Sequence, residues 1–195
     1  MSPRTSEKRI RMVASAALLL REHGASATSI DRVLTHSGTA RGSVYHYFPD
    51  GRAQLIREAV QLAGDYISGL IDEMVRADDP LRALDAFFEL WRAQLIESDY
   101  RAGCPILAVA IEANDDAPEL ARAAAEVFAR WKDALTVLLE RGGLSETRSA
   151  RLATVIIAAV EGAVVLCRAE HSPAPIDATA IEIRDLVAHA LTVQP

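Results

Sequence analysis

Three aromatic rings and a histidine fill four consecutive positions, Tyr45 to Phe48, within the stretch TARGSVYHYFPDGRAQL (39–55). Arginine can bind guanine through two hydrogen bonds, a histidine ring can reach a base edge or a phosphate, and tyrosine hydroxyls donate well to phosphate oxygens. Arg41 and Arg52 flank the cluster. Aromatic residues make up only 5% of the chain, so their concentration here indicates a surface chemistry suited to nucleic acid. The alternative is that Tyr45 and Tyr47 pack against neighbouring helices.

The charge distribution favours the same interpretation. The chain has 195 residues and a net charge of -6, yet residues 1–60 hold nine Lys/Arg and five Asp/Glu, a balance of +4. The other 135 residues hold twelve and twenty-two, a balance of -10. A basic segment on an acidic body is typical of a chain that binds a polyanion through one part only. Chance clustering of solvated charge is the alternative.

The elements around the cluster are predicted to be helical. Apolar residues recur at spacings of three and four throughout, and no alternating strand pattern persists. A first helix, with Ile10, Val13, Ala14 and Ala17 on its inner face, ends near Gly24. Thr28 or Ser29 caps a second helix that ends at Gly38, and a third runs from about 39 to 47, before Pro49.

Helices of these lengths, separated by a glycine turn, are typical of a helix-turn-helix, whose second helix enters the major groove of DNA. On the third helix Val44 and Phe48 lie four residues apart and face the core. The remaining arc exposes Arg41, Ser43, Tyr45, His46 and Tyr47.

Six further helices are expected. Four lie at about 51–76, 81–100, 146–170 and 177–193; between them, one starts at GCP (103–105), and another opens with NDDAP (114–118) and runs to RGG (141–143). The helix over 146–170 is apolar on almost all sides but shorter in its apolar run than the roughly 20 residues of a membrane span, so we expect a buried helix and no membrane. The last helix carries Ile183, Val187 and Ala190, a heptad-like seam able to pack on a second copy. Aromatic residues lie at helical spacing on faces of three body helices, and the family resemblance given below implies that five of them form a ligand-binding set: Tyr66, Phe87, Trp91, Phe128 and Trp131. Plain core packing is the alternative for each.

Other function classes have less support. An enzyme would need a nucleophile and a base such as Cys104 with His171 or His189, and no motif supports that pairing. The two cysteines, Cys104 and Cys167, are too far apart for a metal knuckle or a redox pair, so no metal and no cofactor is predicted. A helical adaptor that binds only protein leaves the basic segment unexplained. No signal peptide pattern is visible, so a cytoplasmic protein is expected.

The stretch TSIDRVLTHSGTARGSVYHYFPDGRAQL (28–55) resembles the DNA-binding signature of the TetR family of transcriptional repressors. The stretches GCPILAVAIEA and FPDGRAQL further resemble the LmrA/YxaF-like branch, which represses multidrug-efflux genes. Departures are Leu34, Thr39 and Ala40, where the family usually has a small residue, a small apolar residue and a serine.

The resemblance implies an all-α, nine-helix, two-domain fold: a helix-turn-helix DNA-binding domain over 1–50 and a ligand-binding and dimerisation domain over 51–195. Carried over by position, it implies DNA contacts for seven residues: Thr28, Arg41, Ser43, Tyr45, His46, Tyr47 and Arg52. The implied function is a homodimer, paired through the last two helices, that binds a pseudo-palindromic operator in double-stranded DNA. A small hydrophobic or aromatic inducer would release it, and efflux genes would be its targets.

Overall fold

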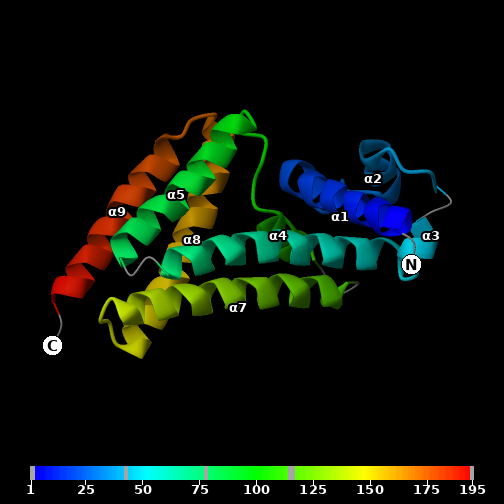
Figure 1. Ribbon diagram of the computed structural model, residues 1–195. Coiled ribbons are helices and arrows are strands. Elements are labelled where there is room, and N and C mark those ends of the chain that lie inside the picture. The colour runs from blue at the N-terminus through cyan, green and yellow to red at the C-terminus, as the bar shows by residue number, and fades with distance from the viewer. Residues whose placement is uncertain (1–2, 42–43, 77–78, 114–116, 194–195) are drawn as a thin grey trace. The chain divides into compact units, whose positions relative to one another are not determined.

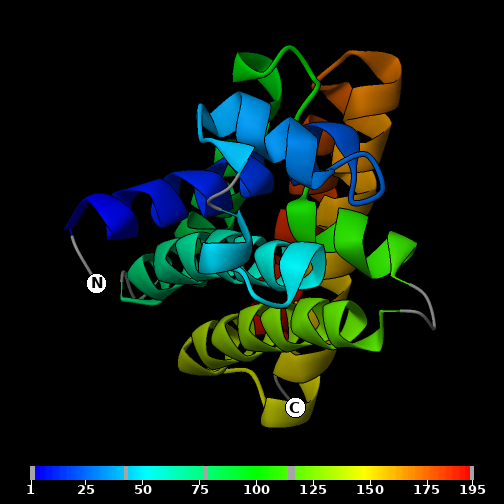
Figure 2. The ribbon, with the colours of Figure 1, turned by 90° about the vertical axis from the view of Figure 1, so that its right-hand side faces the viewer.

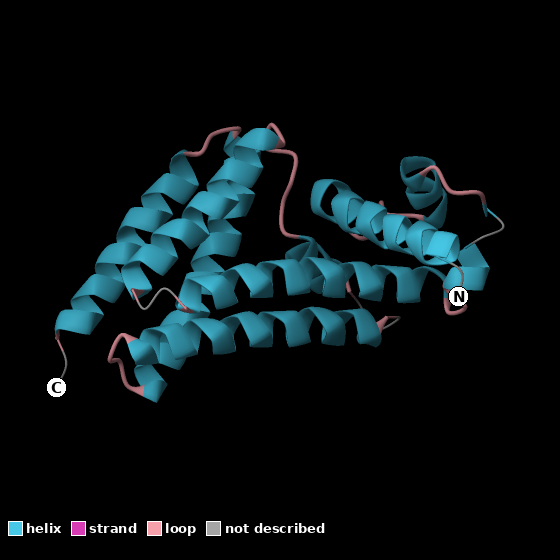
Figure 3. Ribbon diagram, in the orientation of Figure 1, coloured by secondary structure: helices cyan, strands magenta, loops and turns pink. Residues whose placement is uncertain are grey.

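The computed structural model describes residues 3–41, 44–76, 79–113 and 117–193, and within these ranges it has nine α-helices and no strand (Figures 1 and 3). The helices are α1 (Pro3–His23), α2 (Ile30–Ser37), α3 (Val44–Tyr47), α4 (Gly51–Val75), α5 (Pro80–Glu97), α6 (Pro105–Glu112), α7 (Pro118–Arg141), α8 (Glu146–Glu170) and α9 (Ala174–Thr192). The predicted all-α class is therefore confirmed.

The chain divides into two compact units, and the division falls inside α4 and inside α7. The first unit contains residues 1–65 and 104–127, and the second contains residues 66–103 and 128–195. Helix α6, which begins at Pro105, therefore packs in the same unit as α1, α2 and α3, the last of which ends at Tyr47. The expected functional boundary at residue 50 remains a prediction.

The core of the first unit is built by the N-terminal helices. α2 packs across α1, as both views show, and α1 also contacts α6 (Figures 1 and 2). The fully buried side chains of this unit include Met12, Leu20, Val33, Val44, Phe48, Leu55 and Ile56. Removing such side chains from water supplies roughly 1.5–3 kcal/mol each, which fixes the short helices α2 and α3 on a longer scaffold.

Three helices of the second unit, α5, α8 and α9, lie side by side (Figure 1). Arg92 of α5 pairs with Asp177 of α9 at 2.9 Å, and Arg184 of α9 pairs with Asp85 of α5 at 3.0 Å. The predicted dimer seam is wrong, because Ile183, Val187 and Ala190 are buried within the protomer. α9 contacts both α5 and α8, so the apolar stripe that carries these three residues is used inside the chain.

Local capping chemistry sets several helix ends as the sequence predicts. Ser29 caps α2 and accepts a hydrogen bond from the Arg32 N–H at 3.3 Å. Gly38 ends α2 with φ +63°, a left-handed conformation that glycine adopts without a Cβ penalty. Cys104 caps α6, and Pro105 occupies its first turn, where the missing N–H costs nothing.

Helix α8 is the one described helix long and apolar enough to cross a membrane by length and composition, with mean hydropathy 2.0 and half of that window buried in the protein. A core helix passes the same test. Both cysteines are also buried: Cys104 in the first unit and Cys167, on α8, in the second.

Candidate nucleic-acid interface

α2, the turn at Gly38 and α3 form a helix-turn-helix in which the second helix is short. The Thr39 N–H donates to the Leu34 carbonyl at 3.1 Å, so the turn closes directly over the end of α2. α3 is described from Val44 onward rather than from about residue 39 as predicted. Ser43, one of the predicted DNA contacts, lies outside the described residues.

The aromatic cluster is split between core and surface, as predicted for every described residue except Tyr47, which was expected to be exposed. Val44 and Phe48 are fully buried, and the Phe48 N–H donates to the Val44 carbonyl at 2.7 Å. Tyr45 is 68% exposed, His46 is exposed and Tyr47 is half-buried. The His46 and Tyr47 rings meet edge to face, with centroids 5.2 Å apart. Burial of the two apolar residues therefore aims Tyr45 and His46 at solvent.

Arg41 is exposed beside this surface and pairs with an acid of α2. Its Nη2 lies 2.6 Å and 2.8 Å from the two carboxylate oxygens of Asp31. Sequence reasoning missed Asp31, although an acid in the first turn of a helix that approaches DNA is a visible signal.

Thr28 and Arg52 point inward. Thr28 is 1% exposed, and its hydroxyl donates to the Gly24 carbonyl at 2.7 Å. Arg52 donates from Nε to the Thr28 carbonyl at 3.0 Å and from Nη2 to the Ala25 carbonyl. In this structure both residues organise the connection between α1 and α2, and their predicted contact with phosphate stays a prediction.

Glu112, at the end of α6, also binds the connection between α1 and α2. Its carboxylate accepts the backbone N–H of Ala25 at 2.9 Å and that of Ser26 at 2.5 Å. Burial alone raises the pKa of Glu112, but the hydrogen bonds from Ser26 and Ala25 and the charge of Arg52 outweigh it and lower the pKa below 4.5. Sequence reasoning missed this role because about 87 residues separate the partners.

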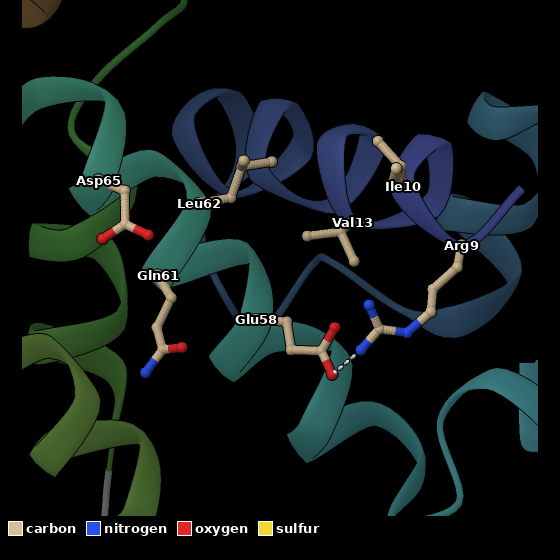
Figure 4. Close-up of a pocket in the computed structure, with 7 residues that line it drawn as sticks. All are labelled: Arg9, Ile10, Val13, Glu58, Gln61, Leu62 and Asp65. Atoms are coloured by element: carbon tan, nitrogen blue, oxygen red, sulfur yellow. Dashed lines mark hydrogen bonds and ion pairs between the residues drawn. The ribbon is translucent and has the colours of Figure 1, made fainter. Parts of the chain in front are cut away.

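Figure 4 shows how Arg9 of α1 is joined to Glu58 of α4. The Arg9 guanidinium donates to Glu58 of α4 at 2.6 Å, beside a groove of about 460 Å³ that Ile10, Val13, Gln61, Leu62 and Asp65 also line. The same guanidinium lies 5.5 Å from the centroid of the Phe48 ring. Arg9 thus fixes the residue that follows α3 to two longer helices.

The five predicted ligand-binding residues all lie in the second unit, in different environments. Phe87, Trp91 and Trp131 are buried, Phe128 is half-buried and Tyr66 is 59% exposed. Phe87 and Trp91 meet edge to face at 6.5 Å. The Trp91 Nε1–H is buried and has no hydrogen-bond partner within the described ranges, an uncommon state for an indole. In the described part of the chain, no group of three His, Cys, Asp or Glu residues could hold a metal ion.

Comparison with known proteins agrees with this geometry. Residues 13–59 match the family described as bacterial regulatory proteins, tetR family, and residues 80–182 match the transcriptional regulator LmrA/YxaF-like C-terminal domain. An uncharacterized HTH-type transcriptional regulator of Mycobacterium tuberculosis, Rv0196, is 46% identical over 92% of this chain and 93% of its own. The HTH-type transcriptional regulator LmrA of Bacillus subtilis is 28% identical over 87% of this chain and 91% of its own.

Solved structures show the same fold. The regulatory protein TetR from Rhodobacter sphaeroides superposes with a TM-score of 0.82 at 22% identity, covering 90% of this chain and 96% of that one. Regulators of this family are soluble cytoplasmic proteins, and the family implies an operator in DNA and a homodimer. The helix-turn-helix, the helix order and the two family matches together show that this chain belongs to the TetR family of bacterial transcriptional regulators, with an LmrA/YxaF-like C-terminal domain.

Proposed function

We propose that the protein is a cytoplasmic, ligand-responsive repressor that binds a pseudo-palindromic operator as a dimer. The observation that carries the proposal is the exposed set Arg41, Tyr45 and His46, presented by a helix-turn-helix within residues 1–60, whose charge balance is +4. The Arg41 guanidinium can bind guanine through two hydrogen bonds, and the Tyr45 hydroxyl can donate to a phosphate. The His46 ring can contact a base or a phosphate.

The salt dependence of DNA binding tests whether this surface binds the phosphate backbone. The logarithm of the affinity should fall linearly with the logarithm of the salt concentration, with a slope of roughly -0.9 per phosphate neutralised. Fluorescence anisotropy with labelled duplex DNA between about 50 and 200 mM salt measures the slope. Selection from random DNA then gives the operator. If the affinity for DNA does not change with salt over this range, a helical adaptor that binds only protein becomes the better explanation.

Dimerisation through α8 and α9 is supported by a second apolar surface, distinct from the buried seam of α9. The exposed side of α8 carries small and apolar residues at helical spacing: Val155, Ala158, Gly162, Val165 and Leu166. A Cβ added at Gly162 would meet no atom within 4 Å, so the surface is open there to a partner helix. Two such faces related by a two-fold axis would bury this stripe.

Gly162→Glu tests the dimer without touching the protomer core. The new carboxylate would lie unpaired at the centre of the α8 face, which should yield a folded monomer with little operator affinity. Ala125→Glu, on the exposed side of α7, is the matched control and should remain dimeric. Light scattering measures both. A Gly162→Glu protein that stays dimeric would exclude this face.

The proposed inducer is a small apolar or aromatic molecule that binds among Tyr66, Phe87, Trp91, Phe128 and Trp131. The buried Trp91 Nε1–H supports a ligand with a hydrogen-bond acceptor, because an unpaired buried donor costs about 1–3 kcal/mol that an acceptor would offset. The LmrA/YxaF-like match supports efflux genes as targets.

Reciprocity provides the test of induction. A coupling free energy of about 1–3 kcal/mol between the inducer site and the operator site changes operator affinity roughly 5- to 150-fold. Bound operator must then lower the affinity for the inducer by the same factor. Tryptophan fluorescence measures ligand affinity with and without operator, and Trp91→Phe removes the donor while keeping a ring. Equal affinities in both states would rule out induction through these residues.

A further inference from the structure

Arg41, in the turn before α3, forms an ion pair with Asp31 of α2. Both carboxylate oxygens of Asp31 face the same nitrogen of Arg41, Nη2, at 2.6 Å and 2.8 Å. The two side chains are 79% and 66% exposed. The Nε and Nη1 donors of Arg41 have no partner among the described residues, so part of the guanidinium is held while the rest remains available.

Stability does not account for this pair. An ion pair so exposed contributes little to folding, since water and salt screen it. Its position is more informative, because Asp31 lies in the first turn of α2, close in sequence to Thr28, for which the family resemblance implies a DNA contact. An unpaired carboxylate there would repel the DNA backbone, and pairing with Arg41 cancels one positive charge of the DNA-binding surface.

We propose that Asp31 is a specificity-determining residue of the DNA-binding surface, acting by holding Arg41 in position for one base edge. The inference rests on the proposed function and extends it to a residue whose charge opposes DNA. Where a guanine presents its O6 and N7 acceptors, the held guanidinium binds with little loss of side-chain freedom. Where no guanine is present, the paired Arg41 adds little attraction and Asp31 adds repulsion toward phosphate.

Asp31 therefore weakens binding to most DNA more than binding to the correct site. Non-specific affinity comes almost entirely from phosphate neutralisation, so a compensated arginine reduces it. Discrimination between sites is a difference of two affinities, and an unfavourable term against wrong sites raises it as effectively as a new contact.

Asp31→Asn tests the proposal, with Asp50→Asn as the matched control. Each substitution removes one negative charge from the same unit and keeps the side-chain size. Asp50 is 74% exposed, and its nearest basic partner is Arg57, 3.9 Å away, rather than Arg41. Wild type and both variants are compared as full-length dimers by selection from random DNA, then by anisotropy on the selected site and on a scrambled duplex of the same length.

Both variants should bind scrambled DNA more tightly by similar factors, because both lose one repulsive charge. Only Asp31→Asn should relax the base preference, by about tenfold at one base pair per half-site. In an Arg41→Ala background, Asp31→Asn should produce no further change in base preference. Circular dichroism melting confirms that each variant is folded.

Three results separate the outcomes. If the wild type binds neither duplex, the proposed function fails as well. If the wild type discriminates and Asp31→Asn follows Asp50→Asn in base preference, only the role of Asp31 is overturned. If Asp31→Asn relaxes the preference equally in the Arg41→Ala background, Asp31 does not act through Arg41, and the inference is overturned while DNA binding stands.

Discussion

Glu112→Gln should destabilise the protein by an amount that can be worked out from its contacts. The carboxylate accepts two backbone N–H groups, from Ala25 and Ser26, and lies near the charge of Arg52. A hydrogen bond to a charged group contributes about 1.5–3 kcal/mol, against about 0.5–1.5 for a neutral one. Glutamine has one acceptor oxygen, so its NH2 group would face one of the two backbone donors.

The expected loss of unfolding free energy is about 1–3 kcal/mol, and we favour the lower half because Glu112 is only half-buried. For a chain of this size, a loss of about 1–2 kcal/mol corresponds to a fall in Tm of roughly 2–8 °C. The control is Glu126→Gln on the exposed side of α7 in the same unit, which should change stability by less than about 0.5 kcal/mol.

The pH dependence provides the sharper measurement. The pKa of Glu112 is lowered by folding, so its stabilising contribution is fully present above the ordinary value of 4.5 and is lost as the pH falls through the folded pKa. The Tm gap between wild type and Glu112→Gln should thus be constant near neutral pH and narrow below about 4.5. Differential scanning calorimetry from pH 7 to about 3.5 follows this. A gap that widens on acidification, or a variant no less stable than Glu126→Gln, would refute the reasoning.

The remaining predictions concern the same unit. Thr39→Val should raise stability by about 1 kcal/mol, because the buried Thr39 hydroxyl has no hydrogen-bond partner among the residues that the structure describes; an unchanged or lower Tm would contradict this. Arg9→Ala should cost about 1–2 kcal/mol through the lost Glu58 and Phe48 contacts, with a smaller loss for Arg9→Lys; equal losses in urea unfolding would show that guanidinium geometry is unimportant. Gly24→Ala should cost more than Gly38→Ala, since both have positive φ but only a Cβ at 24 collides with Glu112; equal Tm values would exclude that collision.

Helix bounds were predictable because local chemistry sets them. α8 runs from Glu146 to Glu170, as expected from the preceding glycines and the apolar run, and Ser29 and Cys104 cap their helices as expected. Capping residues and glycine stops act over three or four residues, so they can be recognised in a single sequence.

Helix faces were harder to predict. Ile10 was expected to point inward and is 58% exposed, whereas Met12, Ala16 and Leu20 are completely buried. Apolar residues lie on several sides of α1, so periodicity alone cannot choose among them. The prediction that Ile183, Val187 and Ala190 of α9 form a dimer contact was wrong for a related reason. A sequence pattern shows that a helix face is apolar, but it does not show which element covers that face.

The candidate site was predictable only in part. The exposure of Tyr45 and His46 followed from the spacing of Val44 and Phe48. The partners of Arg52 and Glu112 did not, because contacts between distant segments leave no local pattern in the chain.

The chemical reactivity of the two buried cysteines can measure how often each part of the protein opens. One thiol lies in each compact unit, Cys104 in the first and Cys167 in the second. Burial raises the pKa of Cys167, so that thiol becomes reactive only when its surroundings open. The rate at which a thiol reagent modifies each residue therefore reports the opening equilibrium of its own unit, without any introduced label. Bound operator should slow the labelling of Cys104 in proportion to its occupancy, and bound inducer should do the same for Cys167. The unmodified chain can thus show which unit each ligand stabilises.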